Sequence, residues 1–374
     1  MAEPRQNWQF GRIYTPDDSW LATAPAEPVL DPDLPVVDPH HHLWQRADHR
    51  YFLDELLADL NTGHKVVATV FLECRSMYRA DGPPEMRPVG ETEFVAGIAA
   101  MSDSGNYGPT RVAAGIVGYA DLTLGDQVEP VLLAHLRAGG GRFRGVRHSA
   151  GWDESPVIGN SRHDMRPHLY QRPDFRTGLK RLTALGLSFD AWVYHPQLGD
   201  VVELARVFPA TPIVMGHVGG TLGYGPYAGR RDEVFGDWKR SMGELAQCPN
   251  VVVKLGGMVN RGAAYDFHGA GAPPSSETMA EVWRPHIETC IELFGPKRCM
   301  FESNFPVDKM AIGYKAPSSA SRGEPRATRN SRCSAAPRRA RTVSPCPNDR
   351  GTRILRLFPV AERPDLQRGP TLPT

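Results

Sequence analysis

Two histidines near the start of the chain, His40 and His42, have the type and spacing that bind a divalent cation. They follow the apolar run 34–37, which predicts a short buried strand. Alternate side chains of a strand point to the same side, so both imidazoles should face one way and His41 the other. Histidine nitrogen is a standard metal ligand at about 2 Å, and one strand fixes two such ligands together. Two histidines alone do not close a metal site, so a histidine-rich turn that lines a pocket without metal remains an alternative.

The elements that would position these residues repeat along the chain. Runs rich in Val, Ile and Phe predict eight strands, at 34–42, 65–74, 111–120, 143–147, 187–195, 212–217, 251–255 and 299–301. Apolar residues spaced by three and four predict helices between them, at 52–60, 91–101, 128–137, 174–185, 198–207, 233–246 and 277–294. Strands that alternate with helices indicate an α/β protein, either a doubly wound sheet or a (β/α)8 barrel.

Polar residues at the ends of the predicted strands favour the barrel. They are His40, His42, Glu73, Asp121, Arg147, His195, His217, Lys254 and Asn304. A barrel gathers all strand ends around one mouth, whereas an open sheet spreads them along an edge. No glycine-rich nucleotide motif follows the first strand. We therefore predict a TIM-like (β/α)8 barrel.

Two strand-end cations and a tryptophan are candidate substrate-binding residues. Arg147 and Lys254 suit a carboxylate or another anionic substituent, so we expect a small anionic substrate. Ion pairs with Glu73 and Asp121 would explain these two cations equally well. Glu73 is itself a candidate for substrate binding. Trp152, in a predicted loop, has a ring that can stack on a substrate.

Composition limits the class of protein. The net charge of the 374 residues is +1, but residues 311–374 hold thirteen Lys and Arg against four Asp and Glu, a net +9, which leaves −8 for residues 1–310. An acidic body and a basic tail without interleaved aromatic residues give no reason to expect nucleic-acid binding. The six cysteines lack CxxC spacing, which indicates free thiols. Without a long apolar run or a signal-like start, we expect a cytoplasmic protein that binds no membrane and can form an oligomer.

The chain divides into three predicted regions. Residues 1–33 contain five prolines and predict an irregular arm, residues 34–310 form the barrel, and residues 311–374 contain nine prolines. Proline removes backbone donors, so this basic tail cannot supply the eighth helix that a barrel requires, and we predict that it is disordered. A reading-frame shift in a GC-rich gene would produce its Arg/Pro/Ser composition.

Four motifs together resemble the amidohydrolase superfamily. They are His40-x-His42, Tyr194-His195-Pro196, Gly216-His217-Val218-Gly219-Gly220 and Ser303-Asn304-Phe305-Pro306. The resemblance covers about residues 34–309 and is closest to the amidohydrolase-2 branch, which includes sugar-lactone hydrolases, 2-pyrone-4,6-dicarboxylate hydrolase and aromatic-acid decarboxylases. It implies a distorted (β/α)8 barrel and a hydrolytic or decarboxylating reaction, with one divalent metal in some members and none in others.

The resemblance also implies roles for the histidines. His40 and His42 match the first-strand metal ligands and His195 the fifth-strand ligand, and His195 falls on one predicted strand face with Phe189, Ala191 and Val193. His217 matches the sixth-strand histidine, a proton shuttle or ligand. The alternative for His217 is that its neighbouring glycines only form a tight turn.

The eighth strand departs from the family pattern. The family has an aspartate that acts as the base, whereas this chain has Asn304, and a neutral amide cannot take a proton from water. Asp308 could supply the carboxylate, His217 could transfer the proton, or the site is a weakened relic. Asp308 could also cap a lost helix.

These residues lead to one expected function and two alternatives. We expect a hydrolase that opens a small lactone or cyclic ester with activated water. One divalent metal, Zn or Mn, would lower the pKa of that water from 15.7 to about 7, although metal-free catalysis remains open. The alternatives are a decarboxylase of an aromatic or related acid and a catalytically impaired remnant.

Overall fold

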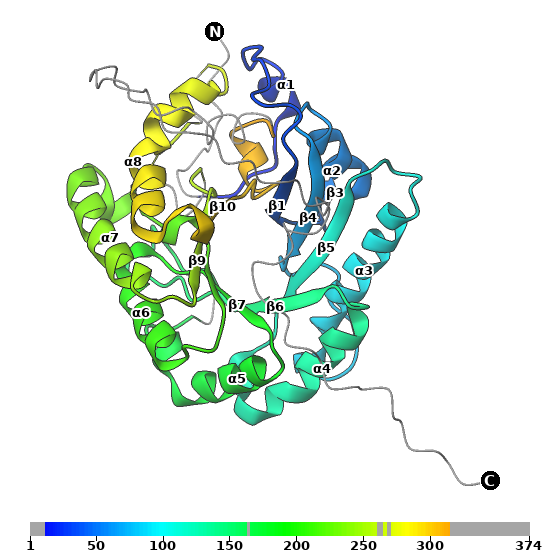
Figure 1. The fold of residues 1–374 in the computed structure, drawn as a ribbon, viewed down its shortest axis with the longest axis vertical. Helices are drawn as coiled ribbons and strands as arrows, with labels where there is room; N and C mark the ends of the chain where they lie inside the picture. Colours follow the sequence, from blue (N-terminus) through cyan, green and yellow to red (C-terminus); the bar gives the residue numbers. More distant parts are fainter. Residues whose placement is uncertain (1–11, 163–164, 260–264, 268–270, 315–374) are drawn as a thin grey trace, which may run out of the picture. The chain divides into compact units, whose positions relative to one another are not determined.

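The computed structural model describes residues 12–162, 165–259, 265–267 and 271–314 (Figure 1). The chain divides into two units, Met1–Arg322 and Gly323–Thr374, and all described residues belong to the first. The prediction of a disordered tail at 311–374 therefore lies outside the described residues, apart from its first four positions.

Eight parallel strands form one sheet in the order of the chain. They are β1 (Val36–His41), β4 (Val66–Leu72), β5 (Arg111–Gly118), β6 (Phe143–Arg147), β7 (Ser188–Ala191), β8 (Ile213–Met215), β9 (Val251–Leu255) and β10 (Cys299–Phe301). The segment after β10 connects the two edge strands, because the Asn304 backbone N–H donates to the His40 carbonyl at 2.9 Å and the His42 N–H donates to the Phe305 carbonyl at 2.7 Å. The sheet is thus a nearly closed barrel, and the predicted TIM-like fold is confirmed.

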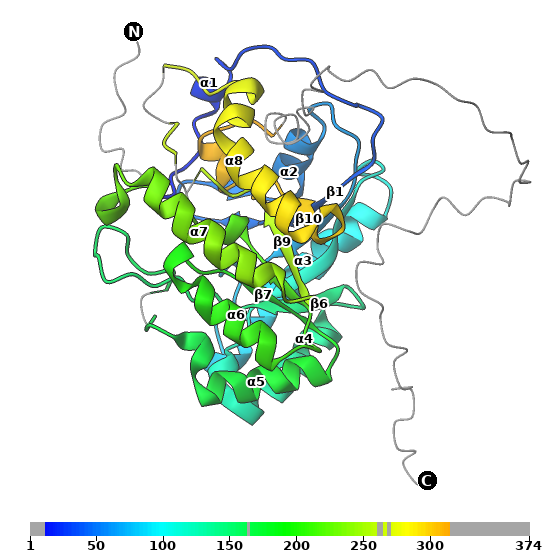
Figure 2. The same cartoon turned by 60° about the vertical axis from the view of Figure 1, so that its left-hand side comes forward.

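In the described part of the chain, the seven longer α-helices lie outside the ring of strands, as Figures 1 and 2 show. They are α2 (Leu53–Leu60), α3 (Val89–Asp103), α4 (Glu129–Ala138), α5 (Pro173–Ala184), α6 (Leu198–Val207), α7 (Arg231–Ala246) and α8 (Ser276–Phe294). Their bounds agree with the predicted ones to within two residues. Two features were not predicted: the short helix α1 (Asp18–Leu21) and a hairpin of β2 (Trp44–Gln45) and β3 (Arg50–Tyr51). No described helix has the combination of length and apolar sequence needed to cross a bilayer.

Local sequence explains where the helices begin and which face they bury. Ser275 accepts a hydrogen bond from the Thr278 N–H at the start of α8, which satisfies one of the free donors of the first turn. In α2, Leu56 and Leu60 are fully buried against the barrel, and each contributes roughly 1.5–3 kcal/mol relative to an exposed position.

The seam between β10 and β1 is covered differently from the rest of the barrel. All residues of β9 are buried, whereas Phe301 in β10 is 38% exposed. In the described part of the chain no α-helix follows β10. Instead a 3-10 turn, Asp308–Met310, leads into Ala311, Ile312 and Tyr314, which are buried in the barrel core.

Strand β7 is shorter than predicted. It ends at Ala191, and His195–Gln197 form a 3-10 turn. Pro196 cannot donate to a strand ladder, and the His195 N–H donates instead to the Gly220 carbonyl at 2.9 Å. The expectation that His195 shares a strand face with Phe189 is therefore wrong, and a turn sets the direction of its ring.

Candidate active site

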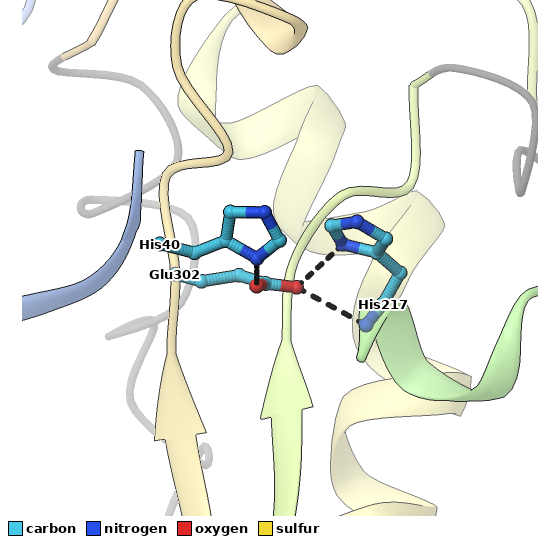
Figure 3. Close-up of side chains that lie close together, drawn as sticks. All are labelled: His40, His217 and Glu302. Atoms are coloured by element: carbon cyan, nitrogen blue, oxygen red, sulfur yellow. Dashed lines mark hydrogen bonds and ion pairs between the residues drawn. The ribbon is translucent and has the colours of Figure 1, made fainter. Parts of the chain in front are cut away.

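A buried carboxylate joins two histidines at the carboxyl ends of β1, β8 and β10 (Figure 3). Glu302 directly follows β10, and its Oε2 accepts a hydrogen bond from His40 Nδ1 at 2.5 Å. Its Oε1 accepts from His217 Nδ1 at 2.7 Å and from the His217 backbone N–H at 3.2 Å. All three side chains are buried, and the carboxylate orients both imidazoles.

The charges of this cluster follow from its contacts. Burial opposes ionisation of Glu302, but the adjacent His217 and His40 hold its pKa well below the usual range. Burial lowers the pKa of His40, with the Glu302 charge opposing the shift. His40 is therefore neutral with its proton on Nδ1, which leaves a lone pair on Nε2.

The Nε2 lone pair of His42 points toward the Nε2 lone pair of His40. The His42 Nδ1–H donates to the Leu72 carbonyl at 2.8 Å, and the His42 Nε2 lies 3.2 Å from His40 Nε2 and 3.3 Å from Asn304 Oδ1. Burial is the main cause that lowers the pKa of His42, so this ring is neutral as well. His41 points the other way, toward Thr69, as strand alternation predicts.

This donor set fits a small divalent cation. Two tetrahedral ligands at about 2.0–2.1 Å from a metal lie about 3.3 Å apart, close to the separation of the two histidine Nε2 atoms. Neither Nε2 carries a proton, so the two nitrogens cannot hydrogen-bond to one another. A second combination of ligand atoms, from His40, His217 and Glu302, lies within 4.8 Å among the described residues.

The predicted anion-binding residues are both held in ion pairs. Arg147 Nε donates to Glu73 at 2.8 Å, and its Nη1 lies 3.4 Å from His40 Nε2. Lys254 Nζ donates to Asp190 at 3.0 Å, so its partner is a residue of β7 and not Asp121. Both cations are buried or nearly so, and each is neutralised by a carboxylate.

Asp308 lies behind Asn304. It is 1% exposed, and its Oδ1 accepts a hydrogen bond from Asn304 Nδ2 at 2.7 Å. This bond fixes the amide so that Asn304 Oδ1 faces His42. The contact favours a positioning role for Asp308.

His195 lies in a different environment from His40 and His42. Its Nδ1 accepts a hydrogen bond from the Leu222 N–H at 3.3 Å, and its ring contacts Tyr227 with centroids 5.0 Å apart. Burial lowers the pKa of His195 to about 4. The neutral ring therefore carries its proton on Nε2, the opposite tautomer to His40. No described contact joins His195 to the other predicted ligands.

A cavity of about 530 Å³ lies beside His195. Its lining includes Trp152, Asp153, Gln197 and Tyr227. Gln197 Oε1 accepts a hydrogen bond from the Trp152 N–H at 2.9 Å, and Tyr227 donates to Asp153 at 2.8 Å. Trp152 thus lines a cavity, as a substrate-stacking residue would.

Comparison with known proteins now identifies the family. The amidohydrolase family model (Amidohydro_2) matches residues 37–331. This chain belongs to the amidohydrolase family. The relative y4mH of Sinorhizobium fredii is 31% identical over 306 residues, covering 76% of this chain and 89% of that protein. An L-fucono-1,5-lactonase of Burkholderia multivorans is 28% identical over 295 residues, covering 74% and 84%.

A solved amidohydrolase structure shares the fold. An amidohydrolase from Burkholderia multivorans with bound zinc aligns with a TM-score of 0.57 at 24% identity, covering 76% of this chain and 89% of that one. This likeness concerns the barrel alone.

Glycines that hold the amidohydrolase site together were not singled out from the sequence. A Cβ on Gly257 would lie 1.9 Å from His217 Nδ1, and its φ of +65° is one that L side chains rarely adopt. A Cβ on Gly256 would lie 2.6 Å from Glu302 Cγ. The signal that could have found them is the Gly-Gly pair directly after the predicted strand 251–255. Glu302, the residue directly before the motif Ser303-Asn304-Phe305-Pro306, was likewise not singled out.

Backbone strain is concentrated at the same place. His217, Val218 and Asn304 have φ of 50°, 46° and 55°, a region that costs residues other than glycine roughly 1 kcal/mol or more. The fold keeps these conformations where His217 and Asn304 meet the buried carboxylate and His42.

Proposed function

We propose that this amidohydrolase opens a small lactone or related cyclic ester with water activated between His40, His42 and His217. The observation that carries the proposal is the fixed tautomer pattern, which directs the unprotonated Nε2 atoms of His40 and His42 at one another, 3.2 Å apart. Two relatives named L-fucono-1,5-lactonase support the lactone class.

The proposal includes one divalent cation, Zn or Mn. His40 Nε2 and His42 Nε2 would hold it together with Asn304 Oδ1, and the zinc in the related structure supports this choice. When bound, the cation supplies a polarised carbonyl and a water of lowered pKa. The sequence-based prediction of His195 as a further ligand stays untested, and the tautomer of that ring favours a hydrogen-bond donor instead.

His217 is the proposed general base. Glu302 holds its proton on Nδ1, so Nε2 is free to accept a proton from water. The carboxylate then stabilises the imidazolium that forms, as an acid partner of a catalytic histidine does. Asn304 cannot take this role because an amide has no basic lone pair, and Asp308 acts through Asn304.

Arg147 and Trp152 are the proposed substrate-binding residues. Arg147, with Nη1 3.4 Å from His40 Nε2, is near enough to the centre to donate to a substrate oxygen, while Glu73 holds its guanidinium. Trp152 would stack on the substrate from the cavity beside His195. An anionic substituent remains a prediction, since Arg147 and Lys254 both have carboxylate partners.

Turnover of a lactone panel tests the proposal. The purified full chain, after elemental analysis, is mixed with L-fucono-1,5-lactone and other five- and six-membered lactones, and acid release is followed with a pH indicator. We expect hydrolysis that a chelator removes and that Zn or Mn restores. A folded chain that releases no acid from any lactone would contradict the proposal. Carbon dioxide release from aromatic acids in parallel samples would support the decarboxylase alternative.

A further inference from the structure

Trp192, the first residue after β7, has a buried indole N–H with no acceptor among the described residues. A buried donor without a partner costs roughly 1–3 kcal/mol. Such a donor at a functional site is explained when a ligand supplies the acceptor. The proposed hydrolysis by His40, His42 and His217 assigns no role to this indole N–H.

The five-membered ring of the indole lies near the residue that precedes His217. Cδ1, the carbon bonded to Nε1, lies 3.6 Å from the position of a Cβ on Gly216, the residue before His217. The opposite edge, at Cζ3, lies 2.9 Å from the position of a Cβ on Gly151. The indole also meets the His217 ring edge-on, with centroids 6.4 Å apart at 86°.

Trp192 is held by its backbone and by an aromatic neighbour. The Trp192 carbonyl accepts a hydrogen bond from the Ala150 N–H at 2.8 Å, and the Trp192 backbone N–H donates to the Tyr170 hydroxyl at 3.3 Å. The Tyr194 ring meets the indole edge-to-face at 5.5 Å. A donor held this rigidly binds an acceptor with little loss of conformational freedom.

We propose that Trp192 donates its Nε1–H to an oxygen of the substrate's lactone group and thereby orients that group toward His217. This inference rests on the proposed lactone hydrolysis. An acceptor beside His217 lies close to the carbonyl that water attacks, so the hydrogen bond strengthens as negative charge develops on the oxygen.

A pair of tryptophan variants tests the inference. Trp192→Phe removes the donor and keeps an aromatic ring, and we expect kcat/KM for the best lactone to fall by roughly 10- to 100-fold. The matched control is Trp283→Phe in α8, because Trp283 also has a buried Nε1 without a described acceptor but belongs to the core. We expect this control to retain kcat/KM within about twofold.

A second variant covers the case in which Trp192→Phe does not fold. Gly151→Ala adds a Cβ that pushes on Cζ3 of the indole, so it shifts the donor without removing it. We expect a reduced kcat/KM here as well, with circular dichroism unchanged. The inference is overturned if Trp192→Phe, or Gly151→Ala where the first variant does not fold, matches Trp283→Phe in kcat/KM. A wild-type chain that hydrolyses no lactone overturns the proposed function, and this inference with it.

Discussion

Two groups of buried histidines at the same end of the barrel differ in where their protons lie. His40 donates from Nδ1 to Glu302 and His42 from Nδ1 to a carbonyl, so the Nε2 atoms of these two neutral rings are acceptors. His217 also donates from Nδ1 to Glu302. His195 accepts a backbone N–H at Nδ1, so its Nε2 is a donor. A histidine at a strand end is therefore a candidate metal ligand only when its hydrogen-bond partners place the proton on the ring nitrogen that points away from the metal.

Two buried carboxyl groups, Glu302 and Glu91, also differ in protonation. The pKa of Glu302 is held low because two histidines contact it, against the effect of burial. Glu91 in α3 accepts hydrogen bonds from the N–H groups of Cys74 and Ser76, yet burial raises its pKa to about 8, with the nearby Glu73 adding to the shift. Equal burial thus leaves one group ionised and the other protonated.

Replacing the ionised carboxylate has the largest expected effect. Glu302→Gln keeps the shape but cannot accept from two imidazole N–H groups, so we expect kcat to fall by about 10³-fold or more. Steady-state rates on the best lactone measure this change. Glu91→Gln is the matched control, since it replaces a buried carboxyl that is already uncharged and lies outside the site, and it should leave kcat nearly unchanged. Equal losses in both variants would show that the carboxylates do not differ in role.

The pH dependence of stability tests whether Glu91 is protonated in the folded chain. Its pKa of about 8 in the fold exceeds the ordinary 4.5, so the folded chain binds the proton more tightly and the free energy of unfolding falls as pH rises from about 5 to 8. We expect a loss of about 3 kcal/mol relative to Glu91→Gln over this range. Urea unfolding of both chains at several pH values measures it, and parallel curves would refute the assignment.

The glycine beside His217 tests how closely the centre is fitted. Gly257→Ala places a Cβ against His217 Nδ1, where Glu302 must bind, so we expect activity to fall by roughly 100-fold. Gly236→Ala in α7 is the control, because a Cβ there meets nothing within 4 Å and should leave activity intact. Activity retained in Gly257→Ala would mean that the contact between His217 and Glu302 is dispensable.

Asp308 has the smallest expected effect. Asp308→Asn weakens the hold on the Asn304 amide without touching His217, so we expect kcat to fall by about 10-fold with the shape of the pH–rate profile unchanged. Loss of the acidic limb of that profile, where the base becomes protonated, would instead identify Asp308 as the base.

Much of the barrel could be predicted because local pattern determines it. Apolar periodicity located the seven helices and eight strands, and strand alternation placed His40 and His42 together and His41 apart. The end of β7 was missed because a contact with Gly220, distant in sequence, ends the strand before Pro196.

The protonation pattern could not be predicted from the sequence. Glu302 meets His40 across 262 residues, and the ion pair of Lys254 with Asp190 depends on two strands that are not adjacent in the sheet. Such partners are set by barrel closure, which no local signal encodes. Gly257 could not be predicted for the same reason, because it follows β9 and its neighbour His217 lies in the turn after β8.

Zinc binding by two histidine variants tests whether His40 and His42, and not His195, hold the metal. The dissociation constant of zinc is measured for the wild-type chain, His42→Gln and His195→Gln by competition with a chromogenic chelator. We expect about one zinc per wild-type chain, at least 100-fold weaker binding in His42→Gln, and wild-type affinity in His195→Gln. Unchanged affinity in His42→Gln, or a loss confined to His195→Gln, would contradict this expectation.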